Sequence, residues 1–207
     1  MKKLNFFLLC SILATQQTFA QISKYQYGIE IGSTINSLTE NFMVIGNDLN
    51  TGYSTGAYFQ YNSAKLFSYK AQIAYVQKGG ESFSNTIPKI KTKLDYLELP
   101  ITTKFSYGNK FKLFAALGPY YGILLSQKNN VIFNDESNGK ETEQIDDFKN
   151  SDFGISSSFG VEFRLNNKIN LSLEKKNSRG LINIAQDQNQ DIKTFTISML
   201  LGINIKL

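Results

Sequence analysis

Apolar and polar residues alternate along most of the chain after Gln21 with a period of two. This period is typical of β-strands whose two faces meet different surroundings. Most of the alternating segments reach the roughly 9–11 residues that a tilted strand needs to cross a bilayer. The alternation predicts eight strands: Tyr25–Thr34, Ser54–Asn62, Phe67–Lys78, Lys93–Ser106, Lys112–Ser126, Asp152–Leu165, Ile169–Asn177 and Lys193–Leu207.

The last segment shows the alternation best. One of its faces is apolar throughout and carries Phe195, Ile197, Met199, Leu201, Ile203, Ile205 and Leu207, while the other face is mostly polar. A soluble β-sandwich also alternates, with its apolar face turned inward. The alternation therefore predicts strands, and it leaves open which face meets lipid.

The lengths of the connections favour a membrane barrel. Short connections follow the second, fourth and sixth strands. The other four are long and polar, and they span Ile35–Tyr53, Gly79–Thr92, Gln127–Ser151 and Ser178–Ile192. Up-and-down outer-membrane barrels combine short periplasmic turns with longer outside loops in this way. We therefore expect an all-β fold, an eight-stranded antiparallel up-and-down transmembrane β-barrel.

Aromatic residues collect at the ends of the predicted strands. Near the short turns lie Tyr25, Tyr27, Tyr61, Phe67, Tyr69, Phe105, Tyr107, Phe111 and Phe163, and near the long loops lie Tyr53, Tyr75, Tyr96 and Phe153. Rings at both membrane interfaces form the aromatic girdles of outer-membrane barrels. We expect these side chains to face lipid.

The first 20 residues have the form of a secretory signal. Lys2 and Lys3 precede a short apolar run, and small residues stand at Thr18 and Ala20. The run is too short for a spanning helix, which needs roughly 20 apolar residues. We expect a signal peptide over 1–20, cleaved between Ala20 and Gln21, and an outer-membrane barrel domain over 21–207.

Four pieces of the chain resemble the PorT-like, or porin-like, family of outer-membrane β-barrels. The most specific piece is the strand Tyr96-Leu97-Glu98-Leu99-Pro100 with Lys104 and Phe105 after it, and the others are Gln77–Gly79, Gly118–Leu124 and Gly28–Gly32. The resemblance implies an eight-stranded membrane barrel without implying one activity. One type of member serves a protein-secretion system of the outer membrane.

The C-terminal strand is similar to the signal that the barrel-assembly machinery reads. Gly202, Ile205 and Leu207 hold the glycine and two apolar places of that signal, although the last residue is Leu rather than Phe. This similarity implies that the machinery is a partner during insertion.

Candidate catalytic residues are scarce. The chain has no histidine, which removes Ser-His-Asp catalysis and histidine metal sites. Its net charge of +5 is spread along the sequence, so nucleic acid is not an expected partner. The loop carboxylates Asp146, Asp147, Asp187 and Asp191 match no calcium-loop spacing. We expect no enzyme, no cofactor and no metal site.

Charged residues on the polar strand faces are more informative. If the apolar faces meet lipid, an inward charge set of both signs results: Glu30, Lys70, Glu98, Lys104, Glu162, Arg164 and Glu174. An eight-stranded barrel is only wide enough for side chains to fill it, and buried charges must pair. We expect one lumenal network that includes Glu98–Lys104 and Glu162–Arg164, and no open pore.

Three functions remain open on this basis. The first is a non-enzymatic outer-membrane barrel that acts through its long loops, with a protein partner at Gln127–Ser151, or as a structural or secretion-associated envelope component. The second is a small ion or solute channel. The third is a soluble periplasmic lipid-binding barrel with its apolar faces inside.

Overall fold

The computed structural model describes residues 24–39, 50–82, 89–132, 140–142, 148–187 and 189–207. The predicted signal peptide, with its cleavage site at Ala20 and Gln21, lies outside these residues. No helix in the described part is long and apolar enough to cross a bilayer. Its strands are β1 (Tyr25–Thr39), β2 (Asn50–Asn62), β3 (Phe67–Ser82), β4 (Lys89–Gly108), β5 (Phe111–Ile132), β6 (Lys140–Thr142), β7 (Ser151–Arg164), β8 (Ile169–Gly180) and β9 (Lys193–Lys206).

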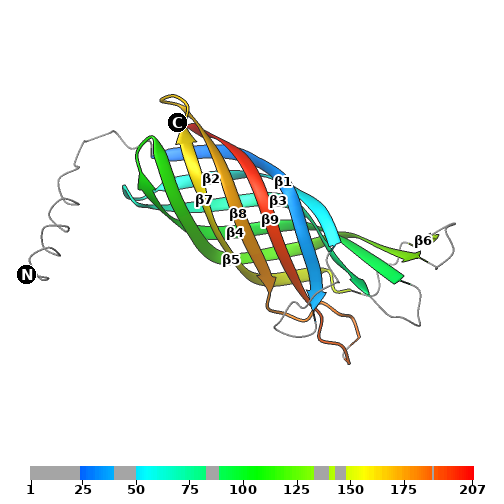
Figure 1. Cartoon of the computed structure of the whole chain (residues 1–207). Coiled ribbons are helices and arrows are strands. Elements are labelled where there is room, and N and C mark those ends of the chain that lie inside the picture. Colours follow the sequence, from blue (N-terminus) through cyan, green and yellow to red (C-terminus); the bar gives the residue numbers. More distant parts are fainter. Residues whose placement is uncertain (1–23, 40–49, 83–88, 133–139, 143–147, 188) are drawn as a thin grey trace, which may run out of the picture.

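Eight of these strands close into a barrel (Figure 1). Each pairs antiparallel with its neighbours, β1 pairs with β9, and the β4–β5 and β5–β7 pairings complete the ring. The short β6 lies outside the ring and pairs only with the end of β5, from Asn129 to Val131. The eight-stranded antiparallel up-and-down barrel predicted from the alternation is confirmed.

The predicted strand ends are accurate at the short turns, whereas most strands extend further toward the long loops than predicted. β3 runs to Ser82 rather than Lys78, and β4 begins at Lys89 rather than Lys93. These extensions pair with each other and with the end of β5. Backbone pairing continues there although these extensions are mostly polar, with Ile90, Val131 and Ile132 the apolar exceptions. The alternation of apolar and polar residues therefore ends before the paired strands do.

The loop predicted over Gln127–Ser151 needs correction for the same reason. Its first six residues, Gln127–Ile132, belong to β5, and β6 lies within its middle. Only residues 133–139 and 143–147 of this segment lie outside the described part. β5 and β6 therefore form a paired ladder that extends away from the barrel mouth (Figure 1).

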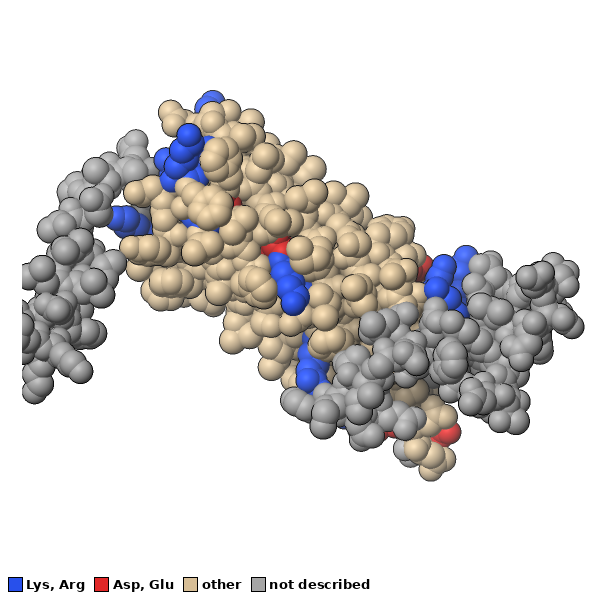
Figure 2. All heavy atoms as spheres, viewed as in Figure 1, with Lys and Arg blue, Asp and Glu red and all other residues tan. Residues whose placement is uncertain are grey.

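Apolar side chains cover the outside of the barrel. Ile29, Ile31, Ile101 and Leu201 each keep about 60% of their surface exposed (62%, 61%, 62% and 64%). The belt is visible as a broad tan surface with few charges (Figure 2). An exposed apolar belt of this extent belongs in lipid. It excludes the soluble lipid-binding barrel, which requires these faces to be inside.

Most of the predicted girdle residues face outward at the ends of the belt. Tyr25 stacks on Phe59 with ring centroids 5.7 Å apart, and Phe67 meets Phe105 at 5.3 Å. The prediction for Tyr96 is wrong, because this side chain is fully buried. Tyr96 and Glu98 are two residues apart on one strand and share its inner face.

Candidate functional site

The barrel interior is lined by polar and aromatic side chains that fit against glycines. A Cβ on Gly28 would lie 2.6 Å from the ring of Tyr58, and one on Gly154 would lie 2.7 Å from the ring of Tyr120. Both distances are shorter than real Cβ contacts, so the bare backbone makes room for each ring. The glycines thus set where large side chains can cross the lumen.

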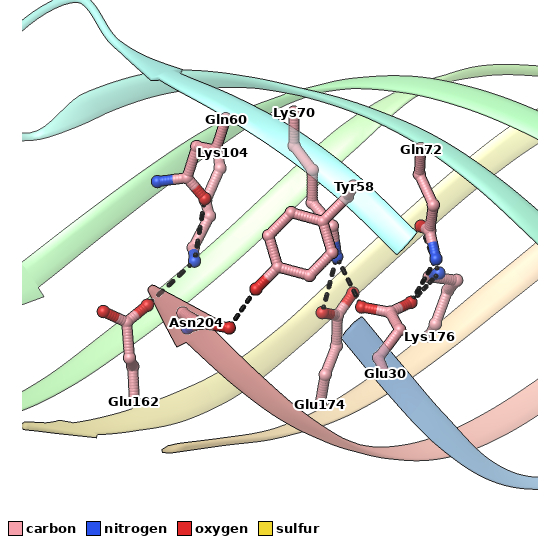
Figure 3. Close-up of polar contacts among 10 residues, drawn as sticks. All are labelled: Glu30, Tyr58, Gln60, Lys70, Gln72, Lys104, Glu162, Glu174, Lys176 and Asn204. Carbon is pink, nitrogen blue, oxygen red and sulfur yellow. Dashed lines mark hydrogen bonds and ion pairs between the residues drawn. The ribbon is translucent and has the colours of Figure 1, made fainter. Parts of the chain in front are cut away.

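A cluster of five polar residues fills the middle of the lumen and is called here the central cluster: Glu30, Lys70, Gln72, Glu174 and Lys176. The Lys70 ammonium lies 2.8 Å from Glu30 and 3.3 Å from Glu174. Lys176 lies 2.9 Å from the other oxygen of Glu30, and Gln72 donates to that oxygen at 2.5 Å. These contacts join β1, β3 and β8 and are drawn in Figure 3. Two carboxylates and two ammonium groups make the cluster neutral.

A second group, the turn-side cluster, lies nearer the short turns and consists of Gln60, Lys104, Glu162 and Asn170. Lys104 contacts Glu162 at 3.1 Å and donates to Gln60 at 3.4 Å (Figure 3). Asn170 donates to the second oxygen of Glu162 at 2.6 Å. Each carboxylate oxygen therefore has its own partner, as a buried charge requires.

A third group, the loop-side cluster, consists of Lys78, Glu98, Tyr120, Asp152 and Thr194. The Lys78 ammonium lies 2.6 Å from Glu98 and 2.8 Å from Asp152. Thr194 and Tyr120 donate to the same Asp152 oxygen at 2.7 and 3.1 Å. One ammonium group here faces two carboxylates that are almost completely buried. The cluster thus carries an excess negative charge when all three groups are ionised.

The structure places the predicted inward charges as follows. Glu30, Lys70, Glu98, Lys104, Glu162 and Glu174 are buried inside the barrel, and Arg164 is half-buried. The partners differ from those expected, because Glu98 contacts Lys78 and Lys104 contacts Glu162. Lys104 lies near the short turn at the end of β4, whereas Glu98 lies six residues earlier in the strand, toward the long loops, so the two cannot meet.

Three charged members of these clusters were not singled out from the sequence: Lys78, Asp152 and Lys176. The sequence does contain a signal for them, which is their position along the strand. Each lies an even number of residues from a predicted inward charge on its own strand. Lys78 follows Lys70 by eight residues on β3, and Lys176 follows Glu174 by two on β8. Side-chain parity along a strand is strict, so it identifies all three.

An apolar cluster, called here the apolar cap, lies at the loop end of the barrel and consists of Leu94, Tyr96, Leu124 and Ile184. Ile184 comes from the β8–β9 connection, and it is fully buried although it belongs to a loop. The other three residues project inward from β4 and β5. The β8–β9 connection therefore inserts a side chain into the barrel mouth at the loop end.

Hydrogen bonds fold this connection around Asn183. The Asn183 side-chain oxygen accepts from the backbone N–H groups of Ala185 and Ile192, both at 2.9 Å. The backbone N–H of Ile184 donates to Ile192, and Lys149 donates from its backbone N–H to Ile184 at 2.7 Å. These bonds hold both flanks of Ile184, so the plugging side chain is supported from the backbone.

We expect Ile184→Ala to loosen the connection without unfolding the barrel. Truncating a buried isoleucine costs about 2–5 kcal/mol, and that loss falls on a loop rather than on the strand ladder. Limited proteolysis of the folded protein should then cut residues 181–192 much faster than in the wild type. Leu181→Ala is the matched control because Leu181 is 48% exposed. Equal cleavage of both variants would show that the cap does not hold the loop.

The charged side chains in these clusters are arranged as ion pairs. No group of three or more His, Cys, Asp or Glu residues that could hold a metal ion occurs in the described part of the chain. Each lumenal carboxylate instead lies beside an ammonium group. The arrangement suits a filled interior.

A family model described as "Outer membrane protein beta-barrel domain" matches residues 17–186. No curated protein matches the chain. Solved structures that resemble it are barrels of low sequence identity. OprG from Pseudomonas aeruginosa is 11% identical with a TM-score of 0.51, and the match covers 89% of this chain and 97% of that one.

Two further structures have a similar fold. Neisserial surface protein A is 11% identical with a TM-score of 0.50, covering 89% of this chain and 98% of that one. The outer membrane protease OmpT from Escherichia coli is 10% identical with a TM-score of 0.51, covering 92% and 99%. Because one of these proteins is a protease and the identities are low, the similarity describes the fold alone.

Proposed function

Because the chain belongs to the family of outer membrane protein β-barrel domains, we propose that it is a non-enzymatic envelope protein whose lumen is filled and whose contacts are made by its loops. It is an outer-membrane barrel embedded in lipid. The proposal adds that the barrel is a rigid platform and that the segment from Gln127 to Ser151 meets a protein partner.

The filled lumen is the observation that carries this proposal. Three ion-pair clusters follow one another along the barrel, and the apolar cap lies beyond them at the loop end. Conduction needs a continuous hydrated path, and interlocked side chains from opposite strands oppose one. The absence of histidine from the sequence further supports a role without catalysis.

The resemblance to PorT-like barrels supports a secretion-associated or structural role within this proposal. The residues that carry it lie in the barrel wall, and Lys78 and Glu98 among them meet in the loop-side cluster. Under the same proposal the segment over 1–20 is a signal peptide, and the C-terminal strand engages the barrel-assembly machinery during insertion.

A small channel is the alternative, and planar bilayers distinguish the two functions. We expect the purified wild-type barrel to give no steady conductance. Glu98→Gln removes one charge from the loop-side cluster, and we expect this variant to give no steady conductance either. Steady conductance in the wild type that changes in Glu98→Gln would contradict the proposal and favour the channel.

The loop proposal is tested by replacing residues 129–147 with a short Gly/Ser linker. Phe148 and Lys149 are kept because Phe148 bridges to Ala185 and Lys149 bonds to Ile184. We expect the variant to insert and to keep its heat-modifiable gel mobility, while a pull-down from intact cells loses the partner. Replacing residues 187–190 in the β8–β9 connection is the control. Loss of the folded barrel, or an unchanged pull-down, would count against the assignment.

A further inference from the structure

The short-turn end of the lumen carries more positive than negative charge. Three inward side chains there are called here the rim cations: Lys112 at the start of β5, Arg164 at the end of β7 and Lys206 at the end of β9. Each is half-buried and lies two residues from a buried residue on the inner face of its strand. Figure 2 shows blue side chains gathered at this end of the barrel, near the C-terminus marked in Figure 1.

The carboxylate beside the rim cations does not neutralise them. Glu162 lies opposite Lys112 in the register of β5 and β7. Both of its oxygens already have partners, Lys104 at 3.1 Å and Asn170 at 2.6 Å. No ion pair or hydrogen bond joins the side chain of a rim cation to another residue in the described part of the chain. Glu162 offsets one charge, that of Lys104, and the three rim cations remain in excess.

The rim cations lie close enough to one another to repel. The charge of Arg164 acts on both Lys112 and Lys206, and the charge of Lys112 acts on Lys206 as well. Repulsion of this kind is stronger beside protein than in open water. The Nε atom of Arg164 is also buried and donates no hydrogen bond to the described residues, which destabilises the fold unless an acceptor lies beside it. An anion among the three side chains would relieve both effects.

We propose that the rim cations bind a water-soluble phosphate, either the free ion or a small phosphate monoester. A phosphate group carries up to two negative charges and three strong acceptor oxygens. The guanidinium of Arg164 donates in a fork that matches two such oxygens. Lys112 and Lys206 contribute ammonium donors from the strands on either side of it. Short turns face the periplasm in outer-membrane barrels, so the ligand enters from that compartment.

A soluble phosphate fits the rim better than a lipid headgroup or a carboxylate does. The rim cations lie on the inner face of the wall, whereas lipid meets the outer face, where Phe111 and Phe163 are exposed. A carboxylate has two oxygens for three cationic groups, while a phosphate has one for each. The site does not require a conducting lumen, because the ligand enters and leaves by the same opening.

Arginine signals in an NMR spectrum test this site directly. The chain contains two arginines, Arg164 and Arg179, so labelling only arginine gives two Nε–H signals, and Arg164→Lys assigns them. The full-length protein in an uncharged detergent is titrated with inorganic phosphate at low ionic strength, where charge is least screened. We expect the Arg164 signal to shift saturably and the Arg179 signal to stay in place.

Two double variants of equal net charge show whether the contact is local. Lys112→Gln/Lys206→Gln removes two rim cations and keeps Arg164 as the reporter. Lys110→Gln/Lys168→Gln is the control, because these lysines are exposed in short turns at the same end. We expect the rim variant to bind phosphate at least about tenfold more weakly and the control to change less than about twofold. Removing like charges does not oppose folding, and heat-modifiable gel mobility verifies each barrel.

Four results would overturn the proposal. An Arg164 signal that phosphate leaves in place, or equal shifts of both arginine signals, would show that no site exists at the rim. Equal weakening in both double variants would show only general attraction to a basic surface. Acetate acting at the same concentration as phosphate would favour a carboxylate ligand. Dioleoyl phosphatidylglycerol that shifts the Arg164 signal when inorganic phosphate does not would favour a lipid headgroup.

Discussion

Lys78→Met should destabilise the barrel by about 3–5 kcal/mol, the cost of leaving buried charge without its partner. The variant retains most of the side-chain volume and removes only the ammonium group. Glu98 and Asp152 then face each other with no cation, at less than 5% exposure each. The chain has no tryptophan, so the free energy of unfolding is measured by far-UV circular dichroism in urea titrations of the protein in lipid vesicles.

Two controls separate charge from mere truncation. Lys193→Met breaks an ion pair with Asp191 of 2.6 Å whose side chains are 35% and 56% exposed, and exposed pairs contribute less than about 1 kcal/mol. Glu98→Gln leaves Lys78 with Asp152, a balanced pair, and should cost much less than Lys78→Met. If Lys78→Met and Glu98→Gln lost similar free energies of unfolding, the result would contradict the idea that Lys78 stabilises the barrel by offsetting the negative charge of the loop-side cluster.

The sequence predicts the barrel wall well because parity is a local property. Every strand end at a short turn lies within two residues of its prediction, since the apolar face there continues to the last paired residue. Glu30 and Glu174 were assigned to the lumen by the same rule and are buried there. The alternation does not reveal the extensions of β3, β4 and β5 beyond the apolar belt, because paired strands outside lipid need no apolar face.

The partners inside the lumen could not be predicted in this way. Which charges meet depends on the register between strands and on the stagger around the closed ring, and the sequence of one strand specifies neither. Lys78 and Asp152 lie 74 residues apart and meet only after closure. The apolar cap could not be predicted for a related reason, since Ile184 lies in a segment whose composition is that of a polar loop.

The second prediction concerns the charge balance of the central cluster and the free energy of unfolding of variants at Glu30 and Lys176. Glu30→Gln leaves two ammonium groups against Glu174 alone, and we expect a loss of about 3–5 kcal/mol. Lys176→Met leaves two carboxylates against Lys70 alone and should cost a similar amount. The double variant keeps one charge of each sign, so it should be more stable than either single variant.

The double-mutant cycle measures this directly by urea unfolding. The single losses should fail to add, with a coupling free energy of about 0.5–3 kcal/mol between Glu30 and Lys176. Combining Glu30→Gln with Lys193→Met, which lies outside the lumen, is the control, and those losses should add. Additivity in both pairs would mean that the lumen is hydrated well enough to screen its charges. It would also weaken the case for a filled barrel. Water that screens these charges must lie beside them in the lumen, where it could form part of a hydrated path.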